Sequence, residues 1–427
     1  MHGRHRGRLV ATGLGGFPSA RRHSAAPRDT GLGRLMRVAL TMTHASGVGG
    51  VERQAHSVAR ALLDAGHEVH VFAQRRDRGV DARIRFHRIP NPIGPWVPRA
   101  SKRSLRAAKV WLFDRLCARA TLREGPFDLV HGFAKTSRQD VYYDGSGCLA
   151  DYQGYSIDTL TSGLQRHWRR ASVHQRVVAR IERARYTRGN FRRILAISDF
   201  VRDQILSRYG LSPDEVETLY PGVDLERFRP IEDAARGALR RELDLPETAP
   251  LLVFLGSDYR RKGLTAFLQT LARLPQAYGL VIGRERPAKL RAYDQQAQAL
   301  GVRSRVHFLG VQPEPGRYLA AADCLLFPTR FDAFGSAVLE ALACGTPVVV
   351  SRCCGAAELV AEGSTGAVVA DPTDPEALAG AARPFLAPRR RAELSRLARQ
   401  EAERHPWQRH LERVLALYAE LVNTQPS

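Results

Sequence analysis

Two series of strand-length apolar runs, each followed by segments of helical period, constrain the fold of this chain most. The first series starts at Met36, where a strand leads into a glycine-rich loop at 46–50 and then a helix that ends at Gly66. Further strands are predicted at 69–73 and 127–133. The apolar residues that define the first strand and helix are Val38, Leu40, Met42, Val51, Ala55, Val58, Ala59 and Leu62. This repeated order predicts a parallel sheet with helices on both faces.

A second α/β series begins near residue 250. Its predicted elements are strands at 251–256, 278–283, 305–310, 324–329 and 347–351, with helices at 264–274 and about 336–343. Between the series, residues 220–230 carry two prolines, a glycine and several charges, which is typical of a linker. We therefore predict two α/β domains, at 36–222 and 223–405. The last segment, 406–427, is predicted to be a helix that returns to the first domain.

Residues 1–35 differ from the rest. They hold seven Arg and one Asp, together with many small residues and no apolar periodicity. They also lack the apolar stretch of a secretory signal. We interpret them as a disordered basic leader or an over-extended gene start rather than a targeting peptide.

Charge narrows the choice of partners. Lys and Arg number 65 against 43 Asp and Glu, a formal net charge of +22, which predicts an anionic partner such as nucleic acid, anionic lipid or a phosphorylated substrate. No apolar run reaches the 18 residues expected of a membrane span. The six cysteines show no Cys-x-x-Cys spacing, which favours reduced thiols in a cytosolic enzyme over a zinc site.

Two segments of the first domain concentrate positive charge. Residues 99–123 carry eight Lys or Arg against one Asp, and residues 165–193 carry ten Arg against one Glu. In the first segment, helical spacing predicts an apolar face formed by Leu105, Ala108, Leu112 and Leu116. In the second, Trp168, Val177, Val178 and Ile181 are interspersed. Both segments are either solvated helix faces or basic surfaces for peripheral contact with the inner-membrane surface.

Ligands of open α/β sheets bind beyond the carboxyl ends of the strands, and three segments fit that position. The first is the glycine loop at 47–50, which has neither a P-loop signature nor the full dinucleotide-binding spacing. The second, 256–263, places Arg260, Arg261 and Lys262 at the start of a helix. Because cations there oppose the helix dipole, an anionic ligand between them is favoured over a solvent-exposed cluster.

The third segment, 327–351, is the most informative. Asp332 lies in a loop after a strand, and Gly335, Ser336 and Ala337 open a helix whose free amides could hold phosphate. Glu340 lies four residues into that helix. This acidic pair is predicted to project into one crevice and to accept hydrogen bonds from the hydroxyls of a sugar and a ribose.

At this segment the sequence resembles the family-4 retaining glycosyltransferases of the GT-B fold. The resemblance implies two Rossmann-like domains that face each other across a cleft. Their Glu-x7-Glu pair and Gly-x-Pro-Val turn correspond here to Asp332-x7-Glu340 and the turn at 345–348. Other matching positions are Gly49, Gly50, Glu52, Arg53, Arg261, Lys262, Gly263 and the Pro-Gly-Val at 221–223. Within the family, the tracts at 135–143, 256–263, 300–308 and 320–326 are similar to the lipopolysaccharide-core heptose α-1,3-glucosyltransferases.

The resemblance implies roles for individual residues. Glu340 would bind the ribose of a nucleotide-sugar donor, Asp332 the hydroxyls of its sugar, and Arg261 and Lys262 its diphosphate. The implied donor-binding set is Gly49, Gly50, Gly256, Ser257, Arg261, Lys262, Asp332, Phe334, Gly335, Ser336, Ala337 and Glu340. The implied catalytic residues are Arg261, Lys262, Asp332 and Asp140. Lys135, Thr136 and Asp140 would line the acceptor side.

Two departures from the family pattern affect this assignment. Position 332 is Asp where the pattern usually has Glu, so the carboxylate reaches one methylene less. An Asp expected six residues after Asp140 is replaced by Ser146, with Asp144 two residues away. A protein base could therefore be Asp140, Asp144 or His131, and for His131 a structural role is equally expected.

The combined hypothesis is a retaining, metal-independent hexosyltransferase that uses UDP-glucose and a lipopolysaccharide-core or related anionic, lipid-linked glycan acceptor. The absence of any Asp-x-Asp triplet agrees with diphosphate neutralisation by cations rather than by a metal cofactor. One alternative is a mannosyl- or N-acetylglucosaminyltransferase for capsule or exopolysaccharide. Another is a sugar-nucleotide epimerase of the same fold. A nucleic-acid binder is suggested by charge alone and leaves 327–351 unexplained.

Overall fold

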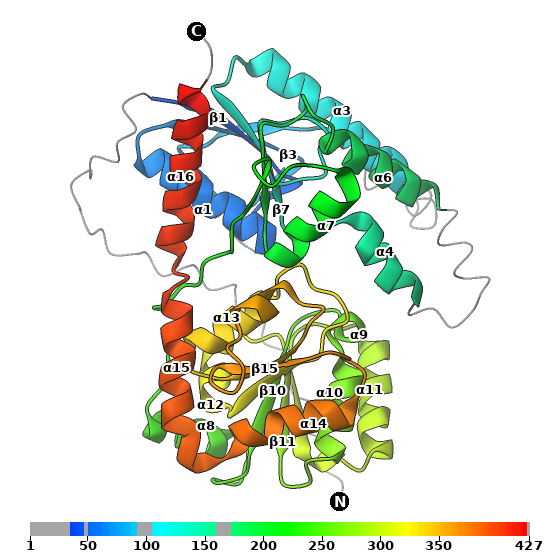
Figure 1. The fold of residues 1–427 in the computed structure, drawn as a ribbon, viewed down its shortest axis with the longest axis vertical. Helices are drawn as coiled ribbons and strands as arrows, with labels where there is room; N and C mark the ends of the chain where they lie inside the picture. The colour runs from blue at the N-terminus through cyan, green and yellow to red at the C-terminus, as the bar shows by residue number, and fades with distance from the viewer. Residues whose placement is uncertain (1–34, 47–49, 92–104, 159–171, 425–427) are drawn as a thin grey trace, which may run out of the picture. The chain divides into compact units, whose positions relative to one another are not determined.

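The computed structural model describes residues 35–46, 50–91, 105–158 and 172–424 (Figure 1). Two separate sheets organise this part of the chain, and every strand pair in both is parallel. The predicted α/β class is therefore confirmed. The predicted leader lies outside the described residues, apart from Leu35.

The first sheet has seven strands in the order β5-β3-β1-β6-β7-β8-β9. Their bounds are β1 (Arg37–Thr41), β3 (Glu68–Ala73), β5 (Arg85–Arg88), β6 (Leu129–Gly132), β7 (Val141–Asp144), β8 (Arg193–Ala196) and β9 (Val216–Thr218). A two-stranded sheet pairs β2 (His44–Ala45) with β4 (Arg75–Arg76). The helices of this half are α1 (Gly50–Asp64), α3 (Arg106–Glu124), α4 (Leu149–Asp158), α6 (Val173–Arg185) and α7 (Asp199–Tyr209).

The second sheet has six strands in the order β12-β11-β10-β13-β14-β15. Their bounds are β10 (Leu251–Leu255), β11 (Tyr278–Ile282), β12 (Val306–Gly310), β13 (Cys324–Phe327), β14 (Val348–Ser351) and β15 (Gly366–Val369). The helices around it are α8 (Asp233–Glu242), α9 (Tyr259–Lys262), α10 (Leu264–Ala272), α11 (Pro287–Ala299), α12 (Pro315–Ala321), α13 (Ser336–Ala343), α14 (Pro375–Ala382) and α15 (Arg391–Glu403). Strands β13 and β14 are buried along their whole length because helices cover both faces of the sheet (Figure 1).

Each sheet has one point where the strand order reverses. In the first sheet it lies between β1 and β6, and in the second between β10 and β13. Loops that leave two neighbouring strands there turn in opposite directions, and the space between them is where open α/β sheets bind ligands. The sequence segments that follow these four strands therefore define the places to examine for function.

The last helix, α16 (Trp407–Asn423), packs against the first sheet's half of the chain, as predicted. Its buried face carries Val414, Leu417 and Leu421. The Tyr418 hydroxyl lies 2.5 Å from His131 Nδ1 on β6. Burial lowers the pKa of His131 to about 3, so this histidine is a neutral core residue beneath α16 rather than a base at a ligand edge.

The predicted apolar face of α3 is wrong by about one position. The helix buries Ala107, Phe113, Asp114 and Cys117, whereas Leu105 is exposed and Leu112 and Leu116 are only half-buried. The reason is tertiary, because Phe113 and Cys117 join a cluster beside β1 and β3. In addition, the Asp114 carboxylate accepts hydrogen bonds from the Ser137 backbone and hydroxyl, at 2.7 and 2.8 Å.

In the second basic segment, Val178 and Ile181 are buried, Val177 is half-buried, and Trp168 lies outside the described residues. Arg185 is not part of a surface. Its side chain is buried, donates to the Thr136 carbonyl at 2.8 Å and lies over the Tyr142 ring at 3.9 Å. No helix among the residues described is both long and apolar enough to cross a bilayer.

Candidate active site

The reversal point of the second sheet brings together the loops after β10 and β13. Backbone and side-chain contacts join them. The Arg261 carbonyl accepts hydrogen bonds from Arg330 N at 2.8 Å and from Thr329 Oγ1 at 3.1 Å. The Arg261 guanidinium in turn donates to the Phe331 carbonyl at 2.8 Å. Segments more than 60 residues apart in sequence thus form one wall of a site.

Gly263 is what permits this close approach. Its φ is +84°, and a Cβ placed there would lie 2.0 Å from the carbonyl oxygen of Pro328. No residue with a side chain can take this position without separating the two loops. The glycine therefore ends α9 and holds Lys262 against the strand end, where its ammonium lies 4.5 Å from the centre of the Phe327 ring.

Asp332 is the anionic centre of this wall. Its Oδ2 lies 3.1 Å from Arg261 Nη1 and is also paired with Lys262 Nζ. All three side chains are at most 21% exposed. Burial by itself raises the pKa of Asp332, but Lys262 and Arg261 outweigh that effect and hold the pKa below its usual value. The site therefore contains two cations, and both are paired with the same carboxylate.

The predicted helix after this loop is present as α13. Gly335 precedes it with a φ of +87°, where a Cβ would lie 2.6 Å from the sulfur of Cys354. Ser336 and Ala337 are its first two residues, and the amides of a first helical turn have no partner within the helix. The sequence prediction of an anion-binding helix start beside Asp332 is consistent with this arrangement.

Glu340, on the same helix, is largely buried. Its Oε1 lies 3.9 Å from Arg53 Nη1 of α1. Burial raises the pKa of Glu340 to about 6, against smaller lowering effects of Arg53, Arg227 and Lys262. The two carboxylates predicted to act as a pair therefore have different environments, since Asp332 has a depressed pKa and Glu340 a raised one.

The remaining residues of the predicted donor set are placed as follows. Gly256 and Ser257 follow β10, and the Ser257 side chain is exposed. Gly50 is the exposed first residue of α1, and Gly49 lies outside the described residues. The Phe334 side chain is 1% exposed, so this residue can offer a ligand only its backbone.

Asp140 does not belong with the other predicted catalytic residues. It precedes β7 at the amino end of the strand, whereas the ligand edge is formed by carboxyl ends. Its carboxylate accepts the backbone N–H of Val130 at 2.7 Å. Thr136 is buried and donates to Gln139 at 2.9 Å. Both are structural positions, and we correct the prediction that places them at the acceptor.

Asp144 is at the carboxyl end of β7, as a site residue should be, but its oxygens are occupied. One accepts the backbone N–H groups of Ser146 and Gly147, both at 3.0 Å, and the other accepts the Tyr186 hydroxyl at 2.5 Å. This carboxylate fixes a turn rather than facing a ligand.

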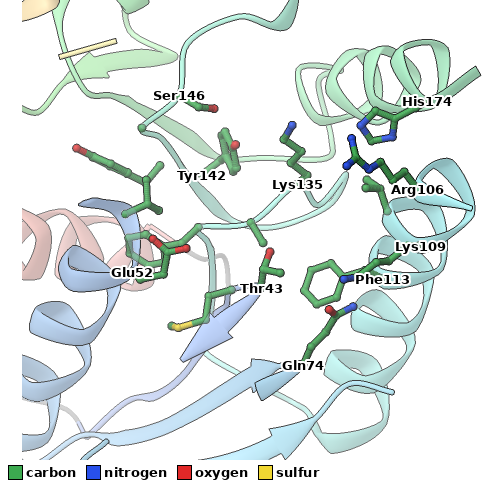
Figure 2. Close-up of a pocket in the computed structure, with 17 residues that line it drawn as sticks. Thr43, Glu52, Gln74, Arg106, Lys109, Phe113, Lys135, Tyr142, Ser146 and His174 are labelled. Carbon is green, nitrogen blue, oxygen red and sulfur yellow. The ribbon is translucent and has the colours of Figure 1, made fainter. Parts of the chain in front are cut away.

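A cavity of about 410 Å³ lies at the reversal point of the first sheet (Figure 2). The loops after β1, β3, β6 and β7 form it together with α1, α3 and α6. Its lining residues are Met42, Thr43, Val51, Glu52, Gln74, Arg106, Lys109, Val110, Phe113, Phe133, Ala134, Lys135, Tyr142, Tyr143, Gly145, Ser146 and His174. Of the residues predicted for the acceptor side, only Lys135 is among them.

Sequence reasoning missed two residues whose contacts join the start of α7 to the second half of the chain. The Ser198 hydroxyl donates to the Ala333 carbonyl at 2.7 Å, next to Asp332. The Glu358 carboxylate accepts the backbone N–H groups of Asp199 and Phe200, at 3.0 and 2.6 Å, at the start of α7. Ser198 has a recognisable signal as an N-cap residue before a helix, but nothing in the sequence indicates its distant partner.

Comparison with known proteins gives a family match for each half of the chain. A family model described as glycosyltransferase family 4 matches residues 48–227, and one described as glycosyl transferases group 1 matches residues 235–404. The chain belongs to these glycosyltransferases, and its two parallel sheets are those of the GT-B fold. Of the function classes considered from sequence, the transferase is therefore the one supported.

Individual relatives fall into two groups. The lipopolysaccharide glucosyltransferase WaaG of Escherichia coli (strain K12) is 29% identical over 336 residues, 77% of this chain and 84% of that protein. The D-inositol 3-phosphate glycosyltransferase of Acidothermus cellulolyticus is 30% identical over an alignment of 431 positions, which covers 90% of each protein.

Solved structures give the same picture of the fold. The crystal structure of WaaG superimposes with a TM-score of 0.73 at 25% identity, over 91% of this chain and all of that one. Anabaena HepE in complex with UDP and glucose has a TM-score of 0.67 at 17% identity, over 90% of this chain and all of that one, and shows the fold alone.

The ion cluster of Arg261, Lys262 and Asp332 leads to a first prediction. We expect Asp332→Asn to lower turnover about 10- to 100-fold, the effect of losing a hydrogen bond to a charged group. Nucleoside diphosphate affinity should be kept or should rise, because Arg261 and Lys262 lose their resident counter-ion. Initial rates and calorimetric titrations measure the two effects separately.

Asp258→Asn is the matched control. Its carboxylate lies 3.3 Å from Arg261 Nε but is half exposed, so its removal should change neither quantity by more than about twofold. Near-normal turnover of the Asp332→Asn protein would show that Asp332 is not an active-site residue.

Proposed function

We propose that this glycosyltransferase moves a hexose, glucose from UDP-glucose, onto a lipopolysaccharide-core or related anionic glycan, with retention of configuration and without a metal ion. The observation that carries the proposal is the cluster of Arg261 and Lys262 with Asp332 at the reversal point of the second sheet. It brings cations that can neutralise a diphosphate next to a carboxylate that can accept a hydrogen bond from a sugar hydroxyl.

Neutralisation of the diphosphate would be the main catalytic effect. Negative charge grows on the leaving diphosphate as the glycosidic bond stretches, and Arg261, Lys262 and the amides at the start of α13 would stabilise it more than they stabilise the bound substrate. Their low exposure strengthens each of these interactions. Cations in this position can take the part that a divalent ion has in metal-dependent transferases.

The carboxylates would orient the donor. Asp332 would accept hydrogen bonds from sugar hydroxyls next to the diphosphate, and Glu340 would accept those of the ribose. With neither carboxylate placed as a nucleophile, the leaving phosphate itself would take the acceptor's proton on the face from which it departs. Retention then needs no covalent enzyme intermediate.

Two classes of acceptor are considered for this enzyme. Similarity to a lipopolysaccharide glucosyltransferase favours a core glycan, whereas the D-inositol 3-phosphate glycosyltransferases favour a smaller phosphorylated acceptor. Both acceptor classes are anionic, in agreement with the net charge of +22. A mannosyl- or N-acetylglucosaminyltransferase of capsule or exopolysaccharide synthesis is the alternative for the donor.

A donor screen tests the proposal. Purified protein is incubated with labelled UDP-glucose, UDP-N-acetylglucosamine or GDP-mannose, each with a heptose-terminated lipopolysaccharide core or inositol 3-phosphate. We expect glucose transfer to the core, an α-linked product by NMR, and a rate unchanged by EDTA, because Arg261 and Lys262 replace the metal.

Each part of the screen can fail separately. Transfer only from GDP-mannose would overturn the proposed donor. Transfer only to inositol 3-phosphate would overturn the proposed core-glycan acceptor. A rate abolished by EDTA and restored by Mg²⁺ would overturn metal independence. A β-linked product would overturn retention.

The raised pKa of Glu340 gives a pH prediction. Above about pH 6 the side chain is a carboxylate and accepts two ribose hydroxyls, and below that pH it is increasingly protonated. The affinity for UDP-glucose, measured by calorimetry between pH 7.5 and 5.5, should therefore fall as the pH is lowered. Glu340→Gln should bind more weakly throughout and without this dependence. A wild-type affinity that does not change with pH would exclude Glu340 from the ribose site.

We also propose that α3 and α6 carry a membrane-facing surface, through which the enzyme contacts the inner face of the cytoplasmic membrane. The two helices are neighbours (Figure 1). Four of the seven large apolar side chains exposed within the described residues belong to α3, α6 or the residue before α3, namely Leu105, Trp111, Leu122 and Val173.

Helix geometry places apolar and basic groups of this surface together. Trp111, Arg115 and Leu122 are spaced by four and seven residues, which puts them on one face of α3. Trp111 is 47% and Leu122 74% exposed, and the Arg115 guanidinium lies 5.9 Å from the Trp111 ring. Apolar side chains among cations are typical of helices that lie in the interface of an anionic bilayer.

Co-sedimentation with phosphatidylglycerol vesicles tests this surface. Replacing Trp111 by Ser, with Arg115→Gln and Arg119→Gln, should weaken binding at least tenfold, since each cation near an anionic surface contributes about 1 kcal/mol. Arg291→Gln with Arg389→Gln, two exposed arginines around the second sheet, is the matched charge control. If both variants lose binding equally, net charge rather than this surface explains it.

A further inference from the structure

The loop that carries Asp332 is held from two sides. It comprises residues 328–335 and joins β13 to α13. The second half of the chain holds its backbone, because Asp332 N donates to the Cys353 carbonyl at 2.9 Å and the Asp332 carbonyl accepts Gly355 N at 3.0 Å. The residues on either side of Asp332 also contact the first half of the chain. Those contacts have no part in the reaction proposed above.

Ser198 contacts the residue after Asp332. As the N-cap of α7, its hydroxyl oxygen accepts the backbone N–H of Val201 at 3.2 Å. A hydroxyl that accepts this bond still has its proton to donate, and Ser198 donates it to the Ala333 carbonyl at 2.7 Å. Ser198 is fully buried, and a Cβ at Gly355 would lie 2.2 Å from the Ala333 oxygen and 2.5 Å from the Ser198 hydroxyl. The glycine therefore leaves the space in which this bond forms.

Phe331, the residue before Asp332, packs against two helices of the first half. Its ring centre lies 5.9 Å from that of Phe200 on α7 and 5.8 Å from that of Tyr152 on α4. Phe331 is 6% exposed. Both sequence neighbours of Asp332 are thus in contact with residues of the first half.

The start of α7 is in turn held in place. The Glu358 carboxylate accepts the backbone N–H groups of Asp199 and Phe200, at 3.0 and 2.6 Å, and amides of a first helical turn have no partner within the helix. The Tyr220 hydroxyl lies 2.8 Å from the same carboxylate. Ser198 and Phe200 therefore belong to a helix end that is fixed to the second half at several points.

An aspartate at position 332 makes this positioning important. Its side chain is one methylene shorter than the Glu of the usual family pattern, so its carboxylate has less reach with which to correct a shift of the backbone. A misplacement of about 1 Å in an active site can cost about 100-fold in rate. The place of the Asp332 carboxylate therefore depends on how the backbone on both sides of it is held.

We infer that Ser198 and Phe200 are positioning residues for Asp332, and that they set the place of its carboxylate through Ala333 and Phe331. Neither needs to touch the donor. The inference rests on the proposed function, in which Asp332 accepts hydrogen bonds from the donor sugar. It deepens that function, because it gives the first half of the chain a part in aligning the donor.

Ser198→Ala tests the inference. With UDP-glucose and a heptose-terminated lipopolysaccharide core, we expect kcat to fall at least tenfold, because the Asp332 carboxylate is displaced. UDP affinity, measured by calorimetry, should stay within about twofold, because Arg261 and Lys262 are unchanged. Phe200→Ala should act in the same direction, and it keeps the N-cap of α7, so it replaces Ser198→Ala if that variant does not fold.

Asp374→Ala is the matched control. Asp374 is the N-cap of α14, where its carboxylate accepts two backbone N–H groups, at 2.9 and 3.1 Å. Its loss removes a helix cap, as Ser198→Ala does, but from a helix that packs against α10 and β15. We expect a similar fall in melting temperature, followed by circular dichroism, and an unchanged kcat. An equal fall of kcat in both variants would mean that lost stability explains it, and would overturn the inference.

A double variant distinguishes positioning from a general effect on the fold. If Ser198 acts through Asp332, adding Ser198→Ala to Asp332→Asn should lower kcat by no more than about twofold further, because coupled residues do not have additive effects. A further loss of about tenfold would show that the two residues act independently. That result would also overturn the inference.

Hydrogen exchange tests the contact without any substrate. In Ser198→Ala, the peptide that covers 328–335 should exchange faster than in the wild type, and in Asp374→Ala it should exchange at the wild-type rate. Unchanged exchange in Ser198→Ala overturns the inference, whichever donor the enzyme uses.

The kinetic outcomes separate this inference from the proposed function. A normal kcat for Ser198→Ala and Phe200→Ala, with Asp332→Asn impaired, overturns the inference alone. A normal kcat for Asp332→Asn overturns the proposed role of Asp332 and the inference with it.

Discussion

The contact between the loops after β10 and β13 is the constraint on which the cluster of Arg261, Lys262 and Asp332 depends. This contact brings Arg261 and Lys262 next to Asp332. It is possible because the backbone at Gly263 lies so close to Pro328 that a side chain at position 263 would not fit. Placing two cations and a carboxylate in a partly buried position is costly unless they satisfy one another. Arg261, Lys262 and Asp332 thus compensate one another's charges in part.

Both sheets have one reversal of strand order, but different side chains surround it in each. At each reversal of strand order the diverging loops leave a space, and the side chains that enter it differ. In the second sheet they form an ion cluster of Arg261, Lys262 and Asp332. In the first they line an open cavity with cations at one end. In the proposed function, the loops of the second sheet hold the sugar donor and those of the first sheet receive the acceptor.

Positive charge in the first half of the chain has more than one use. Arg185 is a core residue that holds the Thr136 carbonyl, Arg106 and Lys109 turn into the cavity, and Arg115 lies on the outer face of α3. A single basic helix can serve a cavity on one side and a lipid surface on the other, because residues three or four apart share a face. The net charge therefore does not indicate which of these uses an arginine or lysine has, whereas its orientation on the helix does.

The sequence by itself determined the α/β class, the loops at the strand ends and the tract around Asp332. These depend on local periodicity and on glycines whose conformation is set by neighbouring residues. Tertiary structure alone decided which side of α3 is buried, that Asp140 caps β6 instead of meeting a ligand, and that Ser198 holds Ala333. Each of these depends on contacts between residues far apart in the chain, and a periodic pattern carries no information about what packs against it.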